Sequence, residues 1–308
     1  MGSQIKYLKA NSIEEAVALL DMYSGKIKIF AGGTDLMVQM YHESKKLDTA
    51  KYFLDIHGIE ELKGISQDGE NISVGALSTH SQLAESDIVQ AAASFLAAAS
   101  LAVGSPQIRN TGTIGGNIFN GSLAADTLSV LLALDASVEL KCLAGNRITS
   151  VESLFSCPDR GIKPGEIAVR FIFKRIDGYK NIFLKLGRRK SLAISRLNVA
   201  MAMKINGNKM EDVRIVTGCI FPKPSRLPAM EGALNGQAVS RELFEDCSRL
   251  ICPIVLKETG MRWSTKYKLP ALKNMVYSAM CKCSGIEEKW EEVLDEPWND
   301  CEWTQGTR

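Results

Sequence analysis

The first part of the chain alternates short strand patterns with helix patterns. Residues 26–30 alternate polar and apolar side chains, which predicts a strand. Ser12 and Glu15 have the spacing of a capping box and predict the start of a helix. Further strands are predicted over 52–54, 72–74, 138–143 and 167–173, and further helices over 86–103 and 126–134.

From about residue 177 the pattern changes to strands followed by helices. Asn206-Gly207-Asn208 lies between two strand patterns and is typical of a hairpin turn. Strands first and helices afterwards indicate an α+β second domain, with a boundary near residue 175. The predicted strands cover 183–186, 198–205 and 213–220, and the predicted helices cover 226–235, 241–252 and 266–281.

Composition excludes several classes of protein. The 308 residues suit two domains of about 150 residues each. With 37 basic and 35 acidic residues, the net charge of +2 gives no basic field that would favour nucleic acid as the main partner. No apolar stretch reaches the roughly 18 residues that a membrane span needs, and the first nine residues lack the apolar core of a signal peptide. We therefore expect a cytoplasmic protein without a membrane span.

The number and spacing of the histidines and cysteines argue against a metal site or a catalytic triad in this chain. None of the eight cysteines forms a Cys-x-x-Cys pair, and the three histidines have no ligand spacing, so no metal site is expected. Gly-x-Ser-x-Gly and His-Glu-x-x-His motifs are absent, and a catalytic triad is not predicted. His57 and His80 are interpreted as surface or packing residues.

Two Gly-Gly motifs carry the most information. Gly32-Gly33 follows a predicted strand and precedes a short apolar helix, so its backbone N–H groups can approach an anion closely. Gly115-Gly116 repeats this design, with Thr113 before it and Asn117 after it. A single Gly-Gly pair is more often just a turn, but two such pairs favour a diphosphate held from both sides. The Rossmann and P-loop motifs are absent, which indicates a different nucleotide-binding fold.

These motifs carry a family resemblance. Residues 30–36 (Phe-Ala-Gly-Gly-Thr-Asp-Leu) and 104–117 (Gly-Ser-Pro-Gln-Ile-Arg-Asn-Thr-Gly-Thr-Ile-Gly-Gly-Asn) resemble the FAD-binding medium subunit of the molybdenum hydroxylases. That family includes bacterial xanthine dehydrogenase, nicotinate dehydrogenase and carbon monoxide dehydrogenase. The resemblance extends over about residues 7–281, includes 185–195, and is strongest to the xanthine and nicotinate dehydrogenase branch.

The resemblance implies an α+β fold with two domains. Residues 1–175 would form a two-lobed FAD-binding domain of the vanillyl-alcohol-oxidase (PCMH) type. Residues 178–282 would form the smaller α/β C-terminal domain of carbon monoxide dehydrogenase flavoproteins, a three-stranded antiparallel sheet with a helix bundle. Residues 283–308 do not match the family. Within them, 286–303 hold eight acids, one lysine and three tryptophans, so an acidic tail follows a basic body.

The resemblance also implies which residues contact FAD. Lys185 matches a lysine near the isoalloxazine, where it would stabilise negative charge on reduced flavin. Asp126 matches an acid at the nucleotide half and suits a ribose hydroxyl, because it would repel phosphate. The implied cofactor-binding residues are Ile29, Phe30, Ala31, Gly32, Gly33, Thr34, Asp35, Leu36, Gly104, Thr113, Ile114, Gly115, Gly116, Asn117, Asp126, Ile167, Ala168 and Lys185.

Several of these residues could have a structural role instead of binding the cofactor. Asp126 could be a helix cap after Ser122, and Lys185 could be one more charge in a solvated basic stretch. Thr34 and Asp35 could only cap the helix that follows them. Arg109 could anchor its loop or contact the cofactor.

The implied function is electron transfer through non-covalently bound FAD, with no metal on this chain. In the family, a large subunit carries molybdopterin and a small subunit carries two [2Fe–2S] clusters. The FAD subunit takes electrons from a cluster and passes them to NAD⁺ or another acceptor. Three alternatives remain: a stand-alone flavin oxidoreductase with its own small-molecule substrate, an assembly subunit without flavin, and a nucleic-acid binder using Arg188-Arg189-Lys190. The last has only a short basic run without interleaved aromatics.

Overall fold

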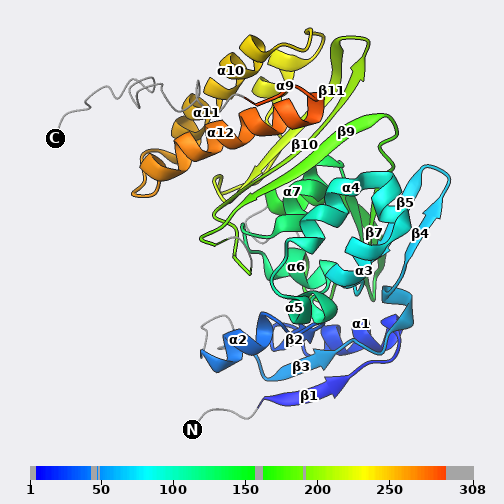
Figure 1. The fold of residues 1–308 in the computed structure, drawn as a ribbon. Helices are drawn as coiled ribbons and strands as arrows, with labels where there is room; N and C mark the ends of the chain where they lie inside the picture. Colours follow the sequence, from blue (N-terminus) through cyan, green and yellow to red (C-terminus); the bar gives the residue numbers. More distant parts are fainter. Residues whose placement is uncertain (1–4, 43–46, 48, 157–161, 190–191, 289–308) are drawn as a thin grey trace.

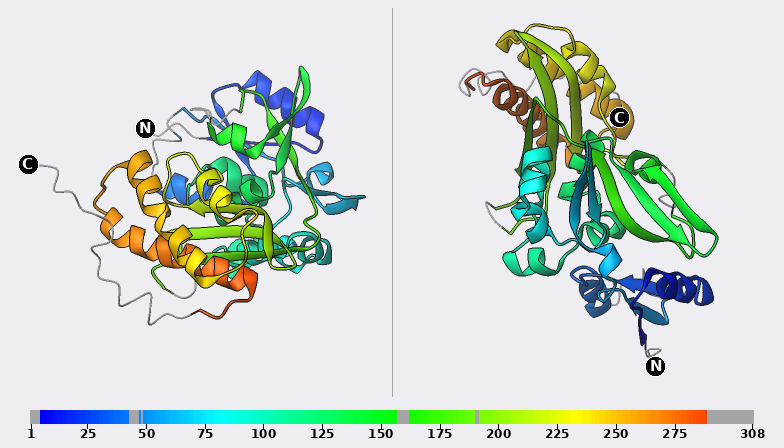
Figure 2. Two further views of the ribbon diagram at one scale, coloured as in Figure 1. Left: turned by 90° about the horizontal axis from the view of Figure 1, so that it is seen from above. Right: turned by 90° about the vertical axis from the view of Figure 1, so that its right-hand side faces the viewer.

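The chain folds into three successive layers, each built on its own β-sheet (Figure 1). The computed structural model describes residues 5–42, 47, 49–156, 162–189 and 192–288. The N-terminal sheet and the C-terminal helices lie at opposite ends, with the second sheet between them (Figures 1 and 2). Each sheet contributes to a separate hydrophobic core, and the cavity described below opens between the first two layers.

The N-terminal lobe is a parallel three-stranded sheet in the order β1-β3-β2. Its elements are β1 (Lys6–Lys9), α1 (Ile13–Met22), β2 (Ile27–Phe30), α2 (Leu36–Tyr41), β3 (Tyr52–Asp55) and the short 3-10 helix η2 (Glu60–Leu62). Ser12 begins α1 as predicted, because its Oγ accepts a hydrogen bond from Glu15 N at 3.1 Å. The apolar side of α1 packs into the core of this lobe.

The second sheet is antiparallel, with the strand order β4-β5-β8-β6-β7. Helices α4 and α7, which the alanine-rich and leucine-rich patterns predict, pack in its core. The elements are β4 (Ile65–Asp68), β5 (Asn71–Gly75), α3 (His80–Glu85), α4 (Asp87–Leu101), α5 (Pro106–Thr111), α6 (Ile114–Asn120), α7 (Asp126–Ala133), β6 (Ser137–Cys142), β7 (Gly145–Ser150), α8 (Val151–Ser156) and β8 (Ile167–Lys174).

The C-terminal layer is an antiparallel sheet covered on both faces. Its elements are β9 (Tyr179–Leu186), β10 (Leu197–Asn206), β11 (Lys209–Gly218), α9 (Pro228–Leu234), α10 (Arg241–Arg249), α11 (Ile251–Thr259) and α12 (Thr265–Ser284). Ala200 and Ala202 of β10 face the core of the second layer, while Val199, Met201 and Met203 face the C-terminal helices. Burial of both faces explains the nearly continuous apolar run of this strand.

Two predicted helices are broken in the structure. Helix α4 has a kink at Ala93, and Asn181 Oδ1 of β9 accepts the Phe95 N–H released there, at 2.9 Å. The helix predicted over 241–252 ends at Arg249 instead, and α11 begins at Ile251. Pro253 has no N–H with which to continue the first helix.

The predicted fold class is confirmed. The α+β class and the three-stranded antiparallel sheet with its helices are present, and the hairpin turns at Gly207, which has φ +61°. None of the described helices is long and apolar enough to cross a membrane. The tail from residue 289, including its tryptophans, and Lys190 of the basic run lie outside the described residues.

Candidate functional site

The first glycine motif connects β2 to α2 and leaves its backbone donors open. Within the described residues, no group accepts a hydrogen bond from the N–H of Gly32, Gly33 or Thr34. Gly33 has φ +69°, and a Cβ there would come within 2.7 Å of the Phe30 ring, so this position favours glycine. Three adjacent donors are thus left open, which is compatible with the anion-binding role that the sequence predicts for this loop.

The two glycine segments touch each other. A Cβ on Gly32 would lie 2.0 Å from the carbonyl oxygen of Thr111 and 2.9 Å from Gly112 Cα. A second link joins the same elements, because Gln39 Nε2 of α2 donates to Asn120 Oδ1 of α6 at 2.9 Å. The N-terminal lobe is therefore held against the second layer through a contact that only glycine permits.

The second glycine motif differs from the first, and the expectation that it repeats the same design is wrong. Gly115 and Gly116 lie in the first turn of α6, after the N-cap Thr113. Their N–H groups already donate to Ala76 O at 2.9 Å and to Thr113 Oγ1 at 3.0 Å. A Cβ on Gly115 would meet Ala76 O at 2.7 Å, so this glycine serves close packing of the helix.

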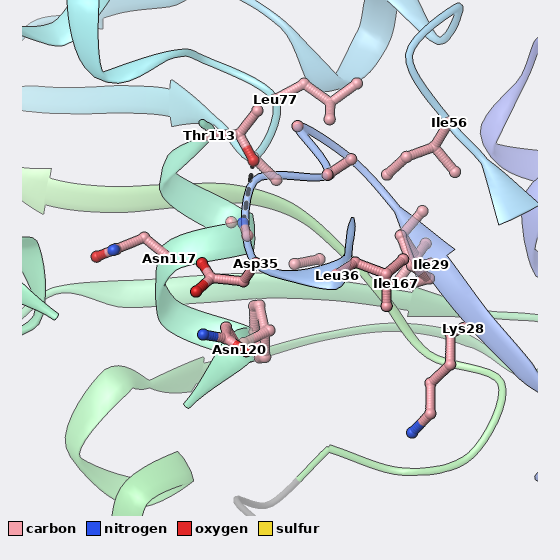
Figure 3. Close-up of a pocket in the computed structure, with 18 of the residues that line it drawn as sticks. Lys28, Ile29, Asp35, Leu36, Ile56, Leu77, Thr113, Asn117, Asn120 and Ile167 are labelled. Atoms are coloured by element: carbon pink, nitrogen blue, oxygen red, sulfur yellow. Dashed lines mark hydrogen bonds between the residues drawn. The ribbon is translucent and has the colours of Figure 1, made fainter. Parts of the chain in front are cut away.

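A cavity of about 630 Å³ lies between the N-terminal lobe, α6 and residues 162–168 (Figure 3). That volume falls within the range of small-molecule sites. Figure 3 shows the polar residues Asp35, Asn117 and Asn120 on one side of the cavity. The apolar part of the wall includes Ile29, Ile56, Leu77 and Ile167. Predicted site residues in the wall are Ile29, Ala31, Gly32, Gly33, Thr34, Asp35, Leu36, Thr113, Gly115, Gly116, Asn117, Ile167 and Ala168.

The other predicted residues lie outside the cavity wall. Phe30 stacks edge-on with Tyr7, and Ile114 is fully buried in the core. The carbonyl of Gly104 accepts a hydrogen bond from Arg109 Nη1 at 3.2 Å, and Val103 O accepts another at 3.1 Å. Arg109 therefore anchors its loop, which is one of its two predicted roles.

His80 is a cavity residue that the sequence interpretation missed. It begins α3, lines the cavity, and has only 2% of its surface exposed. Burial, together with the positive charge of Arg109, lowers the pKa of His80 to about 4, so the ring is neutral at pH 7. No local pattern marks this residue, because its burial depends on the contact between α3 and the glycine segments. His57, in contrast, places Nδ1 3.2 Å from Ala31 O.

An ion pair shapes the segment before β8. The Arg147 guanidinium donates to both Glu166 carboxylate oxygens, at 2.6 and 2.8 Å, and Lys163 N donates to the same group at 2.6 Å. Burial alone would raise the pKa of Glu166, but these donors hold it below its usual range. Glu166 thereby fixes the backbone that presents Ile167 and Ala168 to the cavity.

Comparison with known proteins decides the family. Residues 3–173 match the FAD binding domain in molybdopterin dehydrogenase, and residues 182–282 match the CO dehydrogenase flavoprotein C-terminal domain. The chain belongs to this family of FAD-binding proteins. The resemblance drawn from the two glycine motifs is thus confirmed.

Relatives match nearly the whole length of the chain. The FAD subunit of nicotinate dehydrogenase from Eubacterium barkeri is 32% identical over 282 residues, 88% of this chain and 93% of that protein. The xanthine dehydrogenase FAD-binding subunit from Escherichia coli O157:H7 is 28% identical over 274 residues, 87% of this chain and 92% of that one. A solved chain of carbon monoxide dehydrogenase from Hydrogenophaga pseudoflava has a TM-score of 0.83 and 27% identity, covering 92% and 99% of the two chains.

The cavity in the FAD-binding region fits the chemistry of FAD. The open N–H groups at Gly32 to Thr34 suit a pyrophosphate, and the apolar wall suits a flat ring system. No group of three or more histidine, cysteine, aspartate or glutamate side chains in the described part of the chain could hold a metal ion.

A buried ion pair joins the FAD-binding region to the flavoprotein C-terminal domain. Lys185 Nζ of β9 lies 2.5 Å from Asp126 Oδ2 of α7, and it also donates to Ala102 O at 2.8 Å. The side chains are only 14% and 5% exposed, so the alternative of a solvated lysine is wrong. Asp126 is the first residue of α7 and makes no capping hydrogen bond to the helix, so the capping alternative is wrong too.

Two polar side chains also donate hydrogen bonds to the carboxylate of this ion pair. Asp126 Oδ1 accepts hydrogen bonds from Ser195 Oγ at 2.5 Å and from Asn198 Nδ2 at 3.3 Å. Burial raises the pKa of Asp126, and Lys185 and these donors oppose that rise. The next residue, Thr127, donates to Asn117 Oδ1 at 2.7 Å, which connects the pair to the cavity wall.

Proposed function

We propose that this chain is the FAD-carrying electron-transfer subunit of a multi-subunit molybdenum hydroxylase. A small subunit with [2Fe–2S] clusters would supply electrons, and NAD⁺ or another acceptor would receive them. A large subunit with molybdopterin would oxidise the substrate. The observation that supports this most strongly is the row of open N–H donors beside an apolar cavity, in a chain whose family binds FAD.

The residues of this chain would act by binding and orienting the cofactor. FAD supplies the redox chemistry when it is bound. The N–H groups of Gly32, Gly33 and Thr34 would hold its pyrophosphate, and α6 would pack beside it with Gly115, Gly116 and Asn117 in the cavity wall. The apolar side chains of Ile29 and Ile167 would exclude water from the ring system.

Lys185 would act at the border of the flavin site. Its ammonium group is fixed by Asp126 and by Ala102 O rather than free in the cavity. Its predicted role in stabilising negative charge on reduced flavin would therefore depend on Asp126, which carries the opposite charge. Replacement of Lys185 alone, compared with replacement of both residues, separates an effect on reduced flavin from an effect on the fold.

The purified complex should contain flavin, molybdenum and iron when this chain is isolated from its own host through a tag. We expect about one FAD per chain and two co-purifying subunits, measured by protein identification and by flavin and metal assays. Oxidation of a substrate by the isolated, flavin-loaded chain without any partner would instead support a stand-alone flavin oxidoreductase.

Flavin should be bound without a covalent bond. No cysteine is among the described residues that line the cavity, and their one histidine, His80, lies beside the glycine segments that would hold the pyrophosphate and not the ring. After precipitation of the holoprotein with acid, the supernatant should be yellow and the pellet colourless, as measured by absorbance near 450 nm. A yellow pellet that survives washing in denaturant would contradict this expectation.

A further inference from the structure

His80 lies where the two glycine segments meet. Its backbone N–H donates to Gly112 O at 3.0 Å, which fixes the start of α3 against the loop before α6. Ring atom Cδ2 is 3.4 Å from the position that a Cβ on Gly112 would occupy, and Thr34 Oγ1 is 3.5 Å from the same point. The imidazole and the Thr34 side chain of the first glycine motif therefore lie on the same side of Gly112.

One ring nitrogen of His80 is buried without a partner. Nδ1 is inaccessible to water and forms no hydrogen bond within the described residues. A buried N–H group without an acceptor is rarer in proteins than a buried acceptor atom without a donor. Because the ring is neutral at pH 7, one nitrogen carries the proton and the other carries the lone pair. This places the proton on Nε2.

The protonated nitrogen belongs to the edge of the ring that lies against Gly112. Nε2 is bonded to Cδ2, the atom that lies against Gly112, whereas Nδ1 is on the other side of the ring. Gly112, Thr34 and His80 all line the cavity. A donor directed at this junction needs an acceptor, and the described residues supply none.

We propose that the Nε2–H of His80 donates a hydrogen bond to the pyrophosphate of FAD, beside the N–H groups of Gly32 to Thr34. This inference rests on the proposed function, because it names a further binding residue of the same site. A phosphate oxygen is acceptor-only, and so is complementary to a neutral N–H donor. His80 would thus orient the pyrophosphate without adding a full charge to the site.

Three substitutions test the assignment in flavin-free protein. The side-chain amide nitrogen of His80→Gln can take the place of Nε2, that of His80→Asn reaches only the place of Nδ1, and His80→Leu has no donor. We expect the dissociation constant of FAD to rise about tenfold or more in H80N and H80L, and to stay within about threefold of wild type in H80Q. ADP keeps the pyrophosphate and lacks the flavin. Its dissociation constants should therefore rank the three variants in the same order as those of FAD. Fluorescence titration measures FAD, and calorimetry measures ADP.

The outcomes separate this inference from the proposed function. A wild-type chain that binds no FAD overturns the proposed function itself. Normal FAD binding by wild type together with equal affinity in H80Q, H80N and H80L overturns only the role of His80. Tighter binding by H80N than by H80Q, or a loss of FAD affinity without a loss of ADP affinity, also overturns it. If H80L does not fold, the comparison of H80Q with H80N decides the question.

Discussion

Replacing Gly32 with alanine is expected to weaken FAD binding by roughly a hundredfold. The new Cβ would lie 2.0 Å from Thr111 O and 2.8 Å from Thr111 C, and these are backbone atoms that cannot rotate away. The loop between β2 and α2 must therefore move, and with it the open donors that would hold the pyrophosphate. A hundredfold loss corresponds to about 2.8 kcal/mol, within the roughly 1.5–3 kcal/mol that one hydrogen bond to a charged group is worth.

The same substitution should also destabilise the flavin-free protein by about 1–3 kcal/mol, as other overpacked contacts do. Thermal unfolding without flavin measures this effect, and fluorescence titration measures the affinity for FAD. Gly232→Ala in α9 is a matched control, because a Cβ there meets nothing within 4 Å. The control should keep the wild-type affinity. A G32A protein that binds FAD as tightly as G232A would show that the contact between the glycine segments is not required.

Lys185→Met is expected to lower the free energy of unfolding by about 3–5 kcal/mol. The substitution leaves Asp126 buried without its cation, and removal of one partner of a buried ion pair has an effect of this size. The loss should depend on pH. Burial makes the folded-state pKa of Asp126 higher than its value in the unfolded chain. The contribution of Asp126 to the stability of the variant is therefore greatest at low pH and is lost as pH rises through that folded-state pKa. Urea unfolding at pH 5 and at pH 8 measures both effects.

The double variant Lys185→Met with Asp126→Asn provides the control. It removes both charges and keeps the volume and hydrogen-bonding capacity near Ser195 and Asn198. We expect it to recover most of the stability lost in the single variant and to remove the dependence on pH. Strictly additive effects of the two substitutions would contradict a coupled pair.

The midpoint potential of bound flavin gives a second readout for the same variants. Lys185→Met leaves a negative charge near the flavin site when Asp126 is ionised, and the potential should fall at pH 8. The double variant should return toward wild type because the pair is neutral as a whole. Equal potentials in all three proteins would show that Lys185 stabilises the fold and does not act on reduced flavin.

Local signals predicted much of the fold. The alternation over 26–30, the capping residue Ser12 and the turn at Gly207 each depend on neighbours within a few residues, and all three were predicted correctly. The kink of α4 was not predictable in this way, because Asn181, which accepts the released N–H, lies 86 residues from Phe95. Gly115-Gly116 was mistaken for a second open cradle because a Gly-Gly pair looks alike in a loop and in a capped helix.

The sequence by itself determined the type of most elements, the position of the first glycine loop and, through its two glycine motifs, the family. Each of these depends on chemistry encoded in short consecutive segments. The tertiary structure alone decided that Gly32 touches Thr111 and that Asp126 and Lys185 form one buried pair. It also decided that His80 lines the cavity with a ring nitrogen to which no described residue bonds. The physical reason is common to all three: burial and pairing depend on which distant segments pack together, and no local pattern of residues specifies that packing.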